Sequence, residues 1–598
     1  MNAHLLPILT LLPLATLLAA APSADLASRI RRLGPRPTAD QLGAVLAAKP
    51  PDSPADQREA RSAIADLLQR QLSAIPLGRL SADQRKSLTT VADALWLLTL
   101  NQREDCREPL QDEAFRRWLL ASPQRTSDLL ANLAISFESQ FVYHDDYPRV
   151  LAILRQLFRH AGPQEAERHW PLMLALALVW DHTDRQPLHH QMGPQPPDAS
   201  PDLTRRFDFF RRTLDSRDAP FRPGQLSVAE LTFVVDTPLP VDELEWVREN
   251  VRLQSPERLF HSIRYDQARL AQAAWQWPHG PYTLPAIRQR GGICTDQAYF
   301  TVITLRAHGY PAILFAGEGR RGGHAWVAYL QPRKGWVTDI GRFKDDRYTT
   351  GQAVHPQTGA RVNDHLLPLI CDSSPKARQA DALARLAAIL TLADLPRHAR
   401  LLAEQAIALR PTSTLAWDIR AHLADDATEL TQLLERQANA FRDFPDRVQD
   451  FRLRQARLLR LRGHTNAADR ILQQQTRRAG KRDDLAADAA IAHINAALQD
   501  GQPQKARKLF EAFLKDYRRE AAKLLSYLDL YLIMTHQTGQ AEEALRFIKT
   551  FIRSARRHFD RVAPNDPRFR DWDTRLLIQA HENNGDHKQA EKLRRKLD

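Results

Sequence analysis

Residues 291–343 read GGICTDQAYFTVITLRAHGYPAILFAGEGRRGGHAWVAYLQPRKGWVTDIGRF, and this stretch decides the fold of the middle of the chain. A cysteine follows two glycines and opens a run with apolar residues at helical spacing, which continues to His308 and stops at Gly309. Glycine is common just past the end of a helix. The pattern therefore predicts a helix from Cys294 to His308.

Three short β-patterned runs follow this helix. The first spans residues 310–317, the second is HAWVAYL (324–330) and the third is GWVTDI (335–340). Alternate residues of a strand share a face, so we expect His324 and Trp326 on the same side.

The connection between the second and third runs sets their register. If QPRK is a four-residue connection, Leu330 pairs with Gly335 and Trp326 pairs with Asp339. Asp339 then lies on the face of His324, one diagonal step away and within reach of a hydrogen bond. A five-residue connection would place the two residues on opposite faces.

Cys294 stands at the expected start of its helix, where unpaired backbone N–H groups and the helix dipole favour an anion. We expect the pKa of its thiol to fall, so that the thiolate is favoured. Gly291 and Gly292 are expected to let the chain turn tightly and to let a substrate approach the backbone.

Cysteine, histidine and aspartate in this arrangement can carry out nucleophilic catalysis. His324 would take the thiol proton, and Asp339 would fix the imidazole tautomer and stabilise the imidazolium. The backbone N–H of Cys294 and a second donor would stabilise an oxyanion. The candidates for that second donor are Gln289, Tyr282 and Trp277.

The segments GGICTDQAYFTVITLRAHGYPA, GGHAW and GWVTDIG together resemble the core of the transglutaminase-like superfamily. That core has a G-x-C helix ending in a short turn, then an H-A-W strand, then an aspartate on the following strand. The resemblance covers a small part of the chain, and its three elements occur in the family's order.

This resemblance implies a papain-like fold, in which the cysteine helix packs on an antiparallel sheet. It implies Cys294 as the nucleophile, His324 as the general base and Asp339 as the orienting carboxylate. Members resembling this chain include peptidases, amidases, acyltransferases and inactive relatives. The calcium-binding pattern of the animal cross-linking enzymes is not evident in the sequence, so neither a metal nor another cofactor is implied.

The composition is that of a soluble globular protein, with 43% hydrophobic and 26% charged residues, and 598 residues are too many for a single core. We expect a multi-domain, mainly α protein with a central α+β transglutaminase-like unit. The predicted parts are a helical N-terminal region (25–224), the cysteine domain (225–371) and an α-solenoid of helical repeats (375–598).

The first 24 residues contain LLPILTLLPLATLLAAA, an apolar run of signal-peptide length in which Ala19 and Ala21 form a cleavage pattern. The run lacks Lys and Arg before it, and Pro22 follows the predicted cut. An uncleaved anchor that associates with a membrane is therefore the alternative. We expect an exported protein, periplasmic or associated with the cell envelope.

The C-terminal region contains an internal repeat. Four glycines are each followed five residues later by an alanine: Gly463 and Ala468, Gly501 and Ala506, Gly539 and Ala544, Gly585 and Ala590. Each glycine is expected to end one helix, and each alanine to open the packing face of the next. An earlier unit, HARLLAEQAIALRP, resembles the tetratricopeptide repeat, and such stacks offer an extended surface to a protein partner.

The formal charge of +13 is compatible with nucleic acid or anionic lipid, but the arginines are spread along Ala/Leu-rich helices as solvated faces. No nucleic-acid partner is expected. The glycines of GEGRRGG lack the Lys and Ser/Thr of a phosphate loop. We interpret this segment as a flexible lid, with Arg320 and Arg321 facing an acidic group of the substrate.

Three cysteines cannot build a disulfide framework. Cys106 and Cys371 are expected to be isolated structural thiols, with a disulfide between them as the alternative. His308 is interpreted as a cation that caps a helix end. No metal site is expected in DHTDRQPLHH, because its spacing matches no closed zinc pattern. Its candidate ligands are Asp181, His182, Asp184, His189 and His190.

Together these features favour a cysteine enzyme that hydrolyses or transfers the acyl group of an amide. Hydrolysis is slightly favoured because no acceptor site is visible, and a protein or peptide is the expected substrate. The alternative is a non-enzymatic cell-envelope scaffold whose helical repeats bind a partner protein. Only the enzyme depends on the thiol of Cys294.

Overall fold

The computed structural model describes most of the chain. The described residues are 25–33, 37, 41–42, 45, 54–73, 81–100, 104–133, 145–182, 187–197, 202–253, 255–272, 274–319, 322–342, 351–372, 374–392, 395–478, 482–517, 521–562 and 571–597. The predicted signal segment (1–24), Asp184, Arg320 and Arg321 lie outside them, so the expectations for these residues stay predictions.

The described chain is mainly helical, and its strands form one five-stranded antiparallel sheet. The helices before the sheet are α1 (Asp25–Arg32), α3 (Pro54–Ser73), α4 (Ala82–Leu100), α5 (Arg107–Gln111), α6 (Glu113–Ala121), α7 (Pro123–Asn132), α8 (Tyr147–Arg168), α9 (Trp170–Val179), α10 (Leu203–Asp215), α11 (Val228–Val235), α12 (Val241–Asn250), α13 (Pro256–His261), α14 (Gln267–Ala271), α15 (Leu284–Arg290) and α16 (Cys294–Ala307). The strands are β1 (Ala312–Gly319), β2 (Gly322–Gln331), β3 (Gly335–Ile340), β4 (Gln352–Val354) and β5 (Arg361–Asn363).

A short 3-10 helix, η3 (Asp364–Leu366), leads from the sheet to the C-terminal helices. These are α17 (Leu367–Ile370), α18 (Pro375–Leu392), α19 (Pro396–Leu409), α20 (Thr414–His422), α21 (Ala427–Ala440), α22 (Pro445–Leu461), α23 (Thr465–Arg478), α24 (Asp483–Gln499), α25 (Pro503–Tyr517), α26 (Ala521–Gln537), α27 (Ala541–Val562), α28 (Trp572–Asn583) and α29 (His587–Arg594). None of the described helices is both long and apolar enough to cross a membrane. The expectation of a mainly α chain with a small antiparallel sheet is confirmed, whereas the domain boundaries stay predictions.

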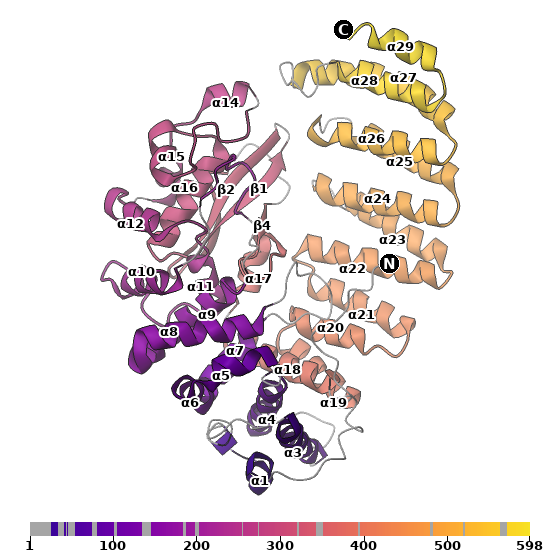
Figure 1. Ribbon diagram of the computed structural model, residues 1–598. Coiled ribbons are helices and arrows are strands. Elements are labelled where there is room, and N and C mark those ends of the chain that lie inside the picture. The colour runs from indigo at the N-terminus through magenta and orange to yellow at the C-terminus, as the bar shows by residue number, and fades with distance from the viewer. Residues whose placement is uncertain are drawn as a thin grey trace.

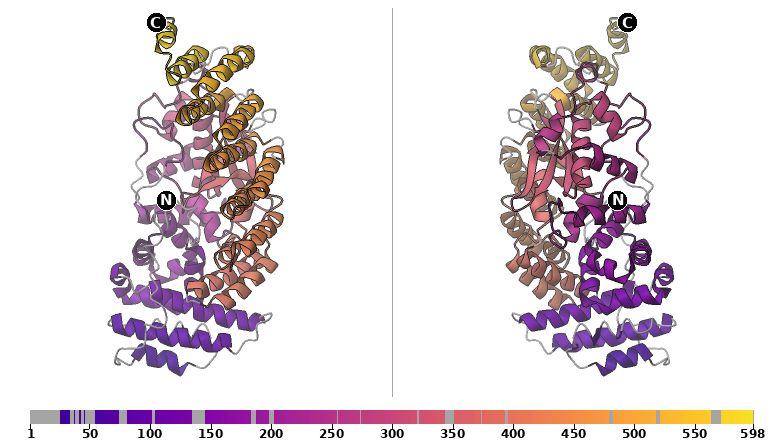
Figure 2. Two further views of the ribbon diagram at one scale, coloured as in Figure 1. Left: turned by 90° about the vertical axis from the view of Figure 1, so that its right-hand side faces the viewer. Right: turned by 90° about the vertical axis from the view of Figure 1, so that its left-hand side faces the viewer.

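The first helices gather at one end of the molecule, and the sheet with α16 lies beyond them (Figures 1 and 2). The helices α18–α29, here called the C-terminal stack, form a row of helix pairs that runs alongside the sheet (Figure 1). Arg385 of α18 pairs with Asp93 of α4 at 3.2 Å in a buried position. One apolar cluster extends from Ala27 to Phe451, so the start of the stack shares a core with the N-terminal helices.

The sheet has the strand order β3-β2-β1-β4-β5. Ala325, Val327 and Tyr329 of β2 belong to the apolar cluster that contains most of α16. Trp326 and Ala328 belong to a different cluster, on the other side of the strand. Both sides of β2 are therefore buried, as alternation along a strand requires.

The glycine–alanine repeat of the C-terminal stack is confirmed. The four glycines follow the ends of α22, α24, α26 and α28 and have φ angles between 68° and 80°. The four alanines that follow them are at most 1% exposed. Small side chains at these positions let successive helices approach closely. The assignment of these helices to the tetratricopeptide class stays a prediction.

Candidate active site

The helix that carries Cys294 begins at the predicted residue and ends one residue before the predicted His308. Its last residue is Ala307, and Gly309 follows with φ +81°. At its start, Gly291 has φ +85°, and a Cβ there would lie 2.4 Å from the carbonyl oxygen of Arg264. Gly291 therefore permits the tight turn into the helix, as expected.

Asp296 anchors the first turn of α16 and is fully buried. Its Oδ2 accepts hydrogen bonds from the N–H of Ile293 at 2.8 Å and from Nη1 of Arg269 at 2.7 Å. Its Oδ1 accepts from the hydroxyl of Tyr282 at 2.9 Å. A Cβ on Gly292 would lie 2.4 Å from the Asp296 side chain, so this glycine makes room for the carboxylate.

This buried network reaches the proline-rich loop before α10. Nε2 of His189 lies 2.9 Å from the hydroxyl of Tyr282, and burial lowers the pKa of His189 to about 3, so its imidazole is neutral. Asp181 instead accepts from the backbone N–H of Asp146 at 2.7 Å. These two members of DHTDRQPLHH serve different contacts, and the described residues contain no cluster of three or more metal-ligating side chains.

The thiol of Cys294 lies where α16 meets β2, and the residue is 9% exposed. Burial raises the pKa of the thiol, while the nearby backbone N–H of Ala325 and the neighbouring Thr295 oppose this rise. The expectation that the pKa of the Cys294 thiol is lowered is therefore wrong. The loss of water around the sulfur outweighs the field of the helix N-terminus. At neutral pH the resting group is the thiol.

Tyr265 is the second group in contact with Cys294. The Tyr265 hydroxyl lies close to both the backbone N–H and the thiol of Cys294, and both affect its pKa. Burial and the neighbouring sulfur raise the pKa of Tyr265 to about 12. An isolated parallel bridge between Tyr265 and Gly292 holds the two chain segments together. The hydroxyl is therefore protonated and fixed beside the sulfur.

His324 begins the buried part of β2 and is 5% exposed. Its ring lies 6.3 Å from that of Trp326 with an interplanar angle of 25°, so the two share a side as predicted. Its Nε2 lies 2.8 Å from the carbonyl oxygen of Gly341. Because a carbonyl can only accept, Nε2 carries the proton and the lone pair is on Nδ1.

The predicted register between β2 and β3 is wrong. Gly335 pairs with Gln331 and not with Leu330, because the connection has three residues. A bulge between Tyr329 and Val327 then shifts the ladder by one further residue.

The bulge removes Asp339 from its predicted place. Tyr329 pairs with Val337, and Val327 pairs with Ile340. Two residues of β3, Thr338 and Asp339, therefore lie opposite the single residue of β2 between these pairs. Asp339 is exposed, and among the described residues no ion pair joins it to His324. The carbonyl of Gly341, two residues further along, contacts the imidazole instead.

Among the described residues, none of the three expected oxyanion donors makes a contact with the Cys294 thiol. Gln289 is exposed, while Tyr282 is committed to Asp296. Trp277 is buried, edge-on to Tyr282 at 5.3 Å. Tyr265 was missed because α14 and α15 separate it from Cys294 along the chain, and only the parallel bridge brings it close.

The remaining thiols and His308 have structural surroundings. Cys106 and Cys371 are free and buried, so the disulfide alternative is wrong. Burial raises the pKa of Cys371 far above that of an ordinary thiol. His308 caps α16 through Nδ1, 2.9 Å from the carbonyl oxygen of Thr304, but burial lowers its pKa. It is a neutral donor and not the expected cation.

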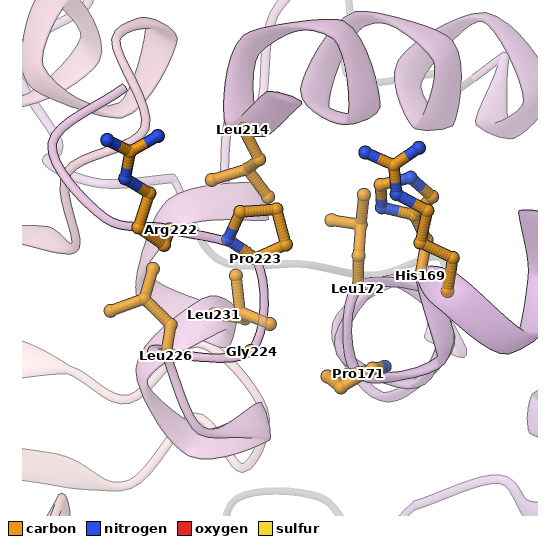
Figure 3. A pocket seen from close by; sticks show the side chains of 10 residues that line it. His169, Pro171, Leu172, Leu214, Arg222, Pro223, Gly224, Leu226 and Leu231 are labelled. Atoms are coloured by element: carbon orange, nitrogen blue, oxygen red, sulfur yellow. The ribbon is translucent and has the colours of Figure 1, made fainter. Parts of the chain in front are cut away.

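A small cavity of about 30 Å³ lies away from this site, between the start of α9, the end of α10 and the loop before α11 (Figure 3). Leucine and proline side chains form most of its wall, with Arg222 and His169 at its sides. Neither Cys294 nor His324 lines it. It is a packing cavity of the N-terminal helices and has no part in the chemistry of the thiol.

No family model and no curated protein matches this chain. The chemistry of the site therefore rests on its own geometry: a buried thiol, a tyrosine hydroxyl and an oriented imidazole on the adjoining strand.

Proposed function

We propose that this protein is a cysteine enzyme of transglutaminase-like type that breaks amide bonds through a thioester on Cys294. The observation that carries the proposal is the position of the Cys294 sulfur. It lies close to the backbone N–H of Ala325, in the peptide that joins Ala325 to His324, which lowers the pKa of the thiol. The nucleophile therefore lies beside the strand residue that follows the proposed general base His324.

The reaction begins from the neutral thiol. Nδ1 of His324 takes the thiol proton as the sulfur attacks the carbonyl carbon of the amide. The C–N bond then breaks, and the departing nitrogen takes the proton from the imidazolium. The acyl group remains on Cys294 as a thioester, which water or an amine resolves with His324 again as the base.

The oxyanion of the tetrahedral intermediate needs two donors. The backbone N–H of Cys294 supplies one, and we assign the other to the Tyr265 hydroxyl. In the resting site the Tyr265 hydroxyl lies close to the backbone N–H and the sulfur of Cys294. An incoming carbonyl oxygen would replace the sulfur as the acceptor for the hydroxyl, which is protonated because its pKa is raised to about 12.

Hydrolysis of a protein or peptide is slightly favoured over acyl transfer, because the sequence shows no acceptor site for a second amine. The same proposal includes the three-part organisation: helical N-terminal region, transglutaminase-like unit and tetratricopeptide-like stack. None of the proposed steps requires a cofactor.

Acylation by an activated ester tests this proposal without knowledge of the natural substrate. The protein is mixed with p-nitrophenyl acetate, and p-nitrophenol release and the mass of the Cys294 peptide are followed. We expect a burst of one equivalent and an acetyl group on Cys294, which hydroxylamine removes. Cys294→Ala should abolish the burst, and His324→Ala should slow it by about 100-fold or more. Acetylation spread over surface lysines, unaffected by Cys294→Ala, would contradict the proposal.

A second candidate function is partner binding by the C-terminal stack. Residues of α24–α28 form an apolar cluster of their own, and α26 exposes Leu530 and Ile533 by 49% and 46%. If the protein is a scaffold, Cys294→Ser should leave partner binding unchanged. If it is an enzyme, the same substitution should abolish the burst of p-nitrophenol. The two readouts separate the candidates.

A further inference from the structure

The last helix pairs of the C-terminal stack have two different sides. First helices of neighbouring pairs pack on each other, since α22 contacts α24 and α26 contacts α28. The second helices α23, α25 and α27 follow one another along the stack (Figure 1). Each of these three has a stripe of exposed residues at helical spacing. The first and second helices therefore present separate surfaces to the solvent.

Charge is distributed unevenly between these two surfaces. Among the described side chains of α23, α25 and α27, eight exposed residues are Lys or Arg, and two are acidic, Asp516 and Glu542. Among those of α22, α24, α26 and α28, two exposed residues are Arg457 and Arg575, and three are acidic. The positive charge is thus concentrated on the side of the second helices.

Six of these eight cations make no ion pair with any described residue. They are Arg470, Arg477, Lys508, Lys515, Lys549 and Arg553, here called the basic face.

The contacts that the basic face does make are weak. Nε of Arg470 and of Arg553 donate to carbonyls of their own helices at 3.4 Å and 3.2 Å. Nζ of Lys515 lies 5.6 Å from the centre of the Phe547 ring. The face keeps its full positive charge on the surface.

Cations that join helices of the stack do have acidic partners. Lys505 of α25 lies 2.5 Å from Asp469 of α23, and Arg556 of α27 lies 3.2 Å from Asp573 of α28. The stack is therefore held together without the basic face, whose charge remains available for a partner.

The chemistry of the face indicates which partner it fits. Apart from Ala512, every exposed described residue of α23, α25 and α27 is polar or charged. A protein partner usually needs buried apolar or aromatic anchors, and single-stranded nucleic acid needs aromatic rings on which bases stack. Lipid headgroups need neither, because cations within a Debye length of an anionic bilayer are attracted without any fit of shape.

We propose that the basic face binds the anionic headgroups of a lipid bilayer and holds the C-terminal stack against a membrane. The inference uses neither Cys294 nor His324, so it goes beyond the proposed function and does not depend on it. The apolar run in the first 24 residues, as a signal segment or as an anchor, is expected to bring the chain to a membrane in either case. The basic face adds an electrostatic contact at the other end of the chain.

The test is co-sedimentation of the full chain with lipid vesicles. One set contains phosphatidylcholine alone, and the other contains equal parts of phosphatidylcholine and anionic phosphatidylglycerol. The apolar N-terminal run contributes equally to both, so the difference between them reports the cations. We expect the wild type to bind the anionic vesicles at least about 100-fold more tightly at low salt. This preference should disappear in 1 M salt, where the Debye length is about 3 Å.

A triple variant removes one cation from each of the three helices: Arg477→Gln, Lys508→Gln and Lys549→Gln. Each cation near an anionic surface strengthens binding by about fivefold, so binding to the anionic vesicles should weaken by about 100-fold. The three side chains make no hydrogen bond or ion pair with described residues, so the fold should be kept. Circular dichroism checks this.

The matched control removes the same charge outside the basic face. Arg397→Gln, Arg457→Gln and Arg575→Gln together change exposed positions on α19, α22 and α28. Binding to the anionic vesicles should stay within about threefold of the wild type, because these positions lie away from the headgroups. Should either triple variant not fold, Lys508→Gln is compared with Arg457→Gln, and only the former should weaken binding, by about fivefold.

Three results would overturn the inference. Equal binding of the wild type to both kinds of vesicle would show that the cations do not act on lipid. Equal losses in the variant and its control would show that net charge acts and the face does not. Tighter binding of a short DNA duplex than of anionic vesicles, at the same concentration of phosphate, would assign the face to nucleic acid.

Discussion

Nε2 of His324 lies 2.8 Å from the carbonyl oxygen of Gly341, so a backbone carbonyl occupies the place expected for a triad carboxylate. A carbonyl fixes the tautomer as well as a carboxylate does, because it accepts the same hydrogen bond. It carries no full charge, however, and stabilises an imidazolium less. This arrangement suits a base that receives the proton only during the attack.

Asp339→Asn should therefore leave acylation by p-nitrophenyl acetate within about twofold of the wild type, with stability changed by less than about 0.5 kcal/mol. The side chain is exposed and does not contact the imidazole. Burst rates and urea unfolding check this. A fall in the acylation rate of 100-fold or more, as expected when a triad carboxylate is removed, would show that Asp339 takes part in catalysis.

Tyr265→Phe removes the proposed second oxyanion donor and leaves the ring in place. We expect the acylation rate to fall by about 10- to 100-fold with little change in the thermal midpoint. The alkylation rate at pH 10 should change far less, since alkylation forms no oxyanion. An equal loss in both reactions would mean that the hydroxyl only positions the thiol.

Asp296→Asn should destabilise the fold by about 3–5 kcal/mol, because it leaves Arg269 buried without its charged partner. The side chains of this pair are 5% and 0% exposed, with 2.7 Å between them. Urea unfolding measures the change. Asp242→Asn is the control, since its side chain is 74% exposed and should cost less than about 0.5 kcal/mol. Similar costs for both variants would show that the Asp296 network is unimportant.

The ion pair between His365 and Asp446 makes stability depend on pH. The His365 pKa is raised to about 9, so its contribution is complete below the unfolded value of 6.5 and is lost as pH rises through 9. A double-mutant cycle of His365→Gln and Asp446→Asn should give a coupling of about 1–3 kcal/mol at pH 6 and almost none at pH 10. A coupling independent of pH would mean that the imidazole is neutral.

Ala506→Asp introduces a charge at a position with 0% exposure in the C-terminal stack. The stack beyond α23 should unfold, since its apolar cluster is separate from the one that holds Cys294. Circular dichroism should show a lower helix content. The burst of p-nitrophenol from acylation of Cys294 should persist if α22 keeps its contacts with the sheet region. Complete loss of folded protein would show that the stack is inseparable from the catalytic core.

Local patterns predicted the elements of this site well. The apolar spacing from Cys294, ended by Gly309, gave the limits of α16, and alternation gave β2 and β3. The glycine–alanine repeat predicted four helix ends and four buried contacts correctly. In each case the signal lies within about ten residues, where backbone geometry alone links sequence to structure.

The connections between elements were harder to predict. One residue in the hairpin loop and one in the bulge opposite Ala328 moved Asp339 away from His324, and alternation carries no signal for either. The contact of Tyr265 with Cys294 depends on packing across two intervening helices. The raised pKa of the thiol is also a result of tertiary burial, which a helix N-terminus by itself does not reveal.

The most direct test of the central claim is the pH dependence of Cys294 alkylation in the wild type and in His324→Ala. Cys106 and Cys371 can remain, because both are buried and the adduct is located by peptide mass. We expect a rate that rises between about pH 6 and 7 in the wild type and only above about pH 9 in His324→Ala. Identical profiles that rise only at high pH would contradict it, and Cys294 would then be an ordinary buried thiol.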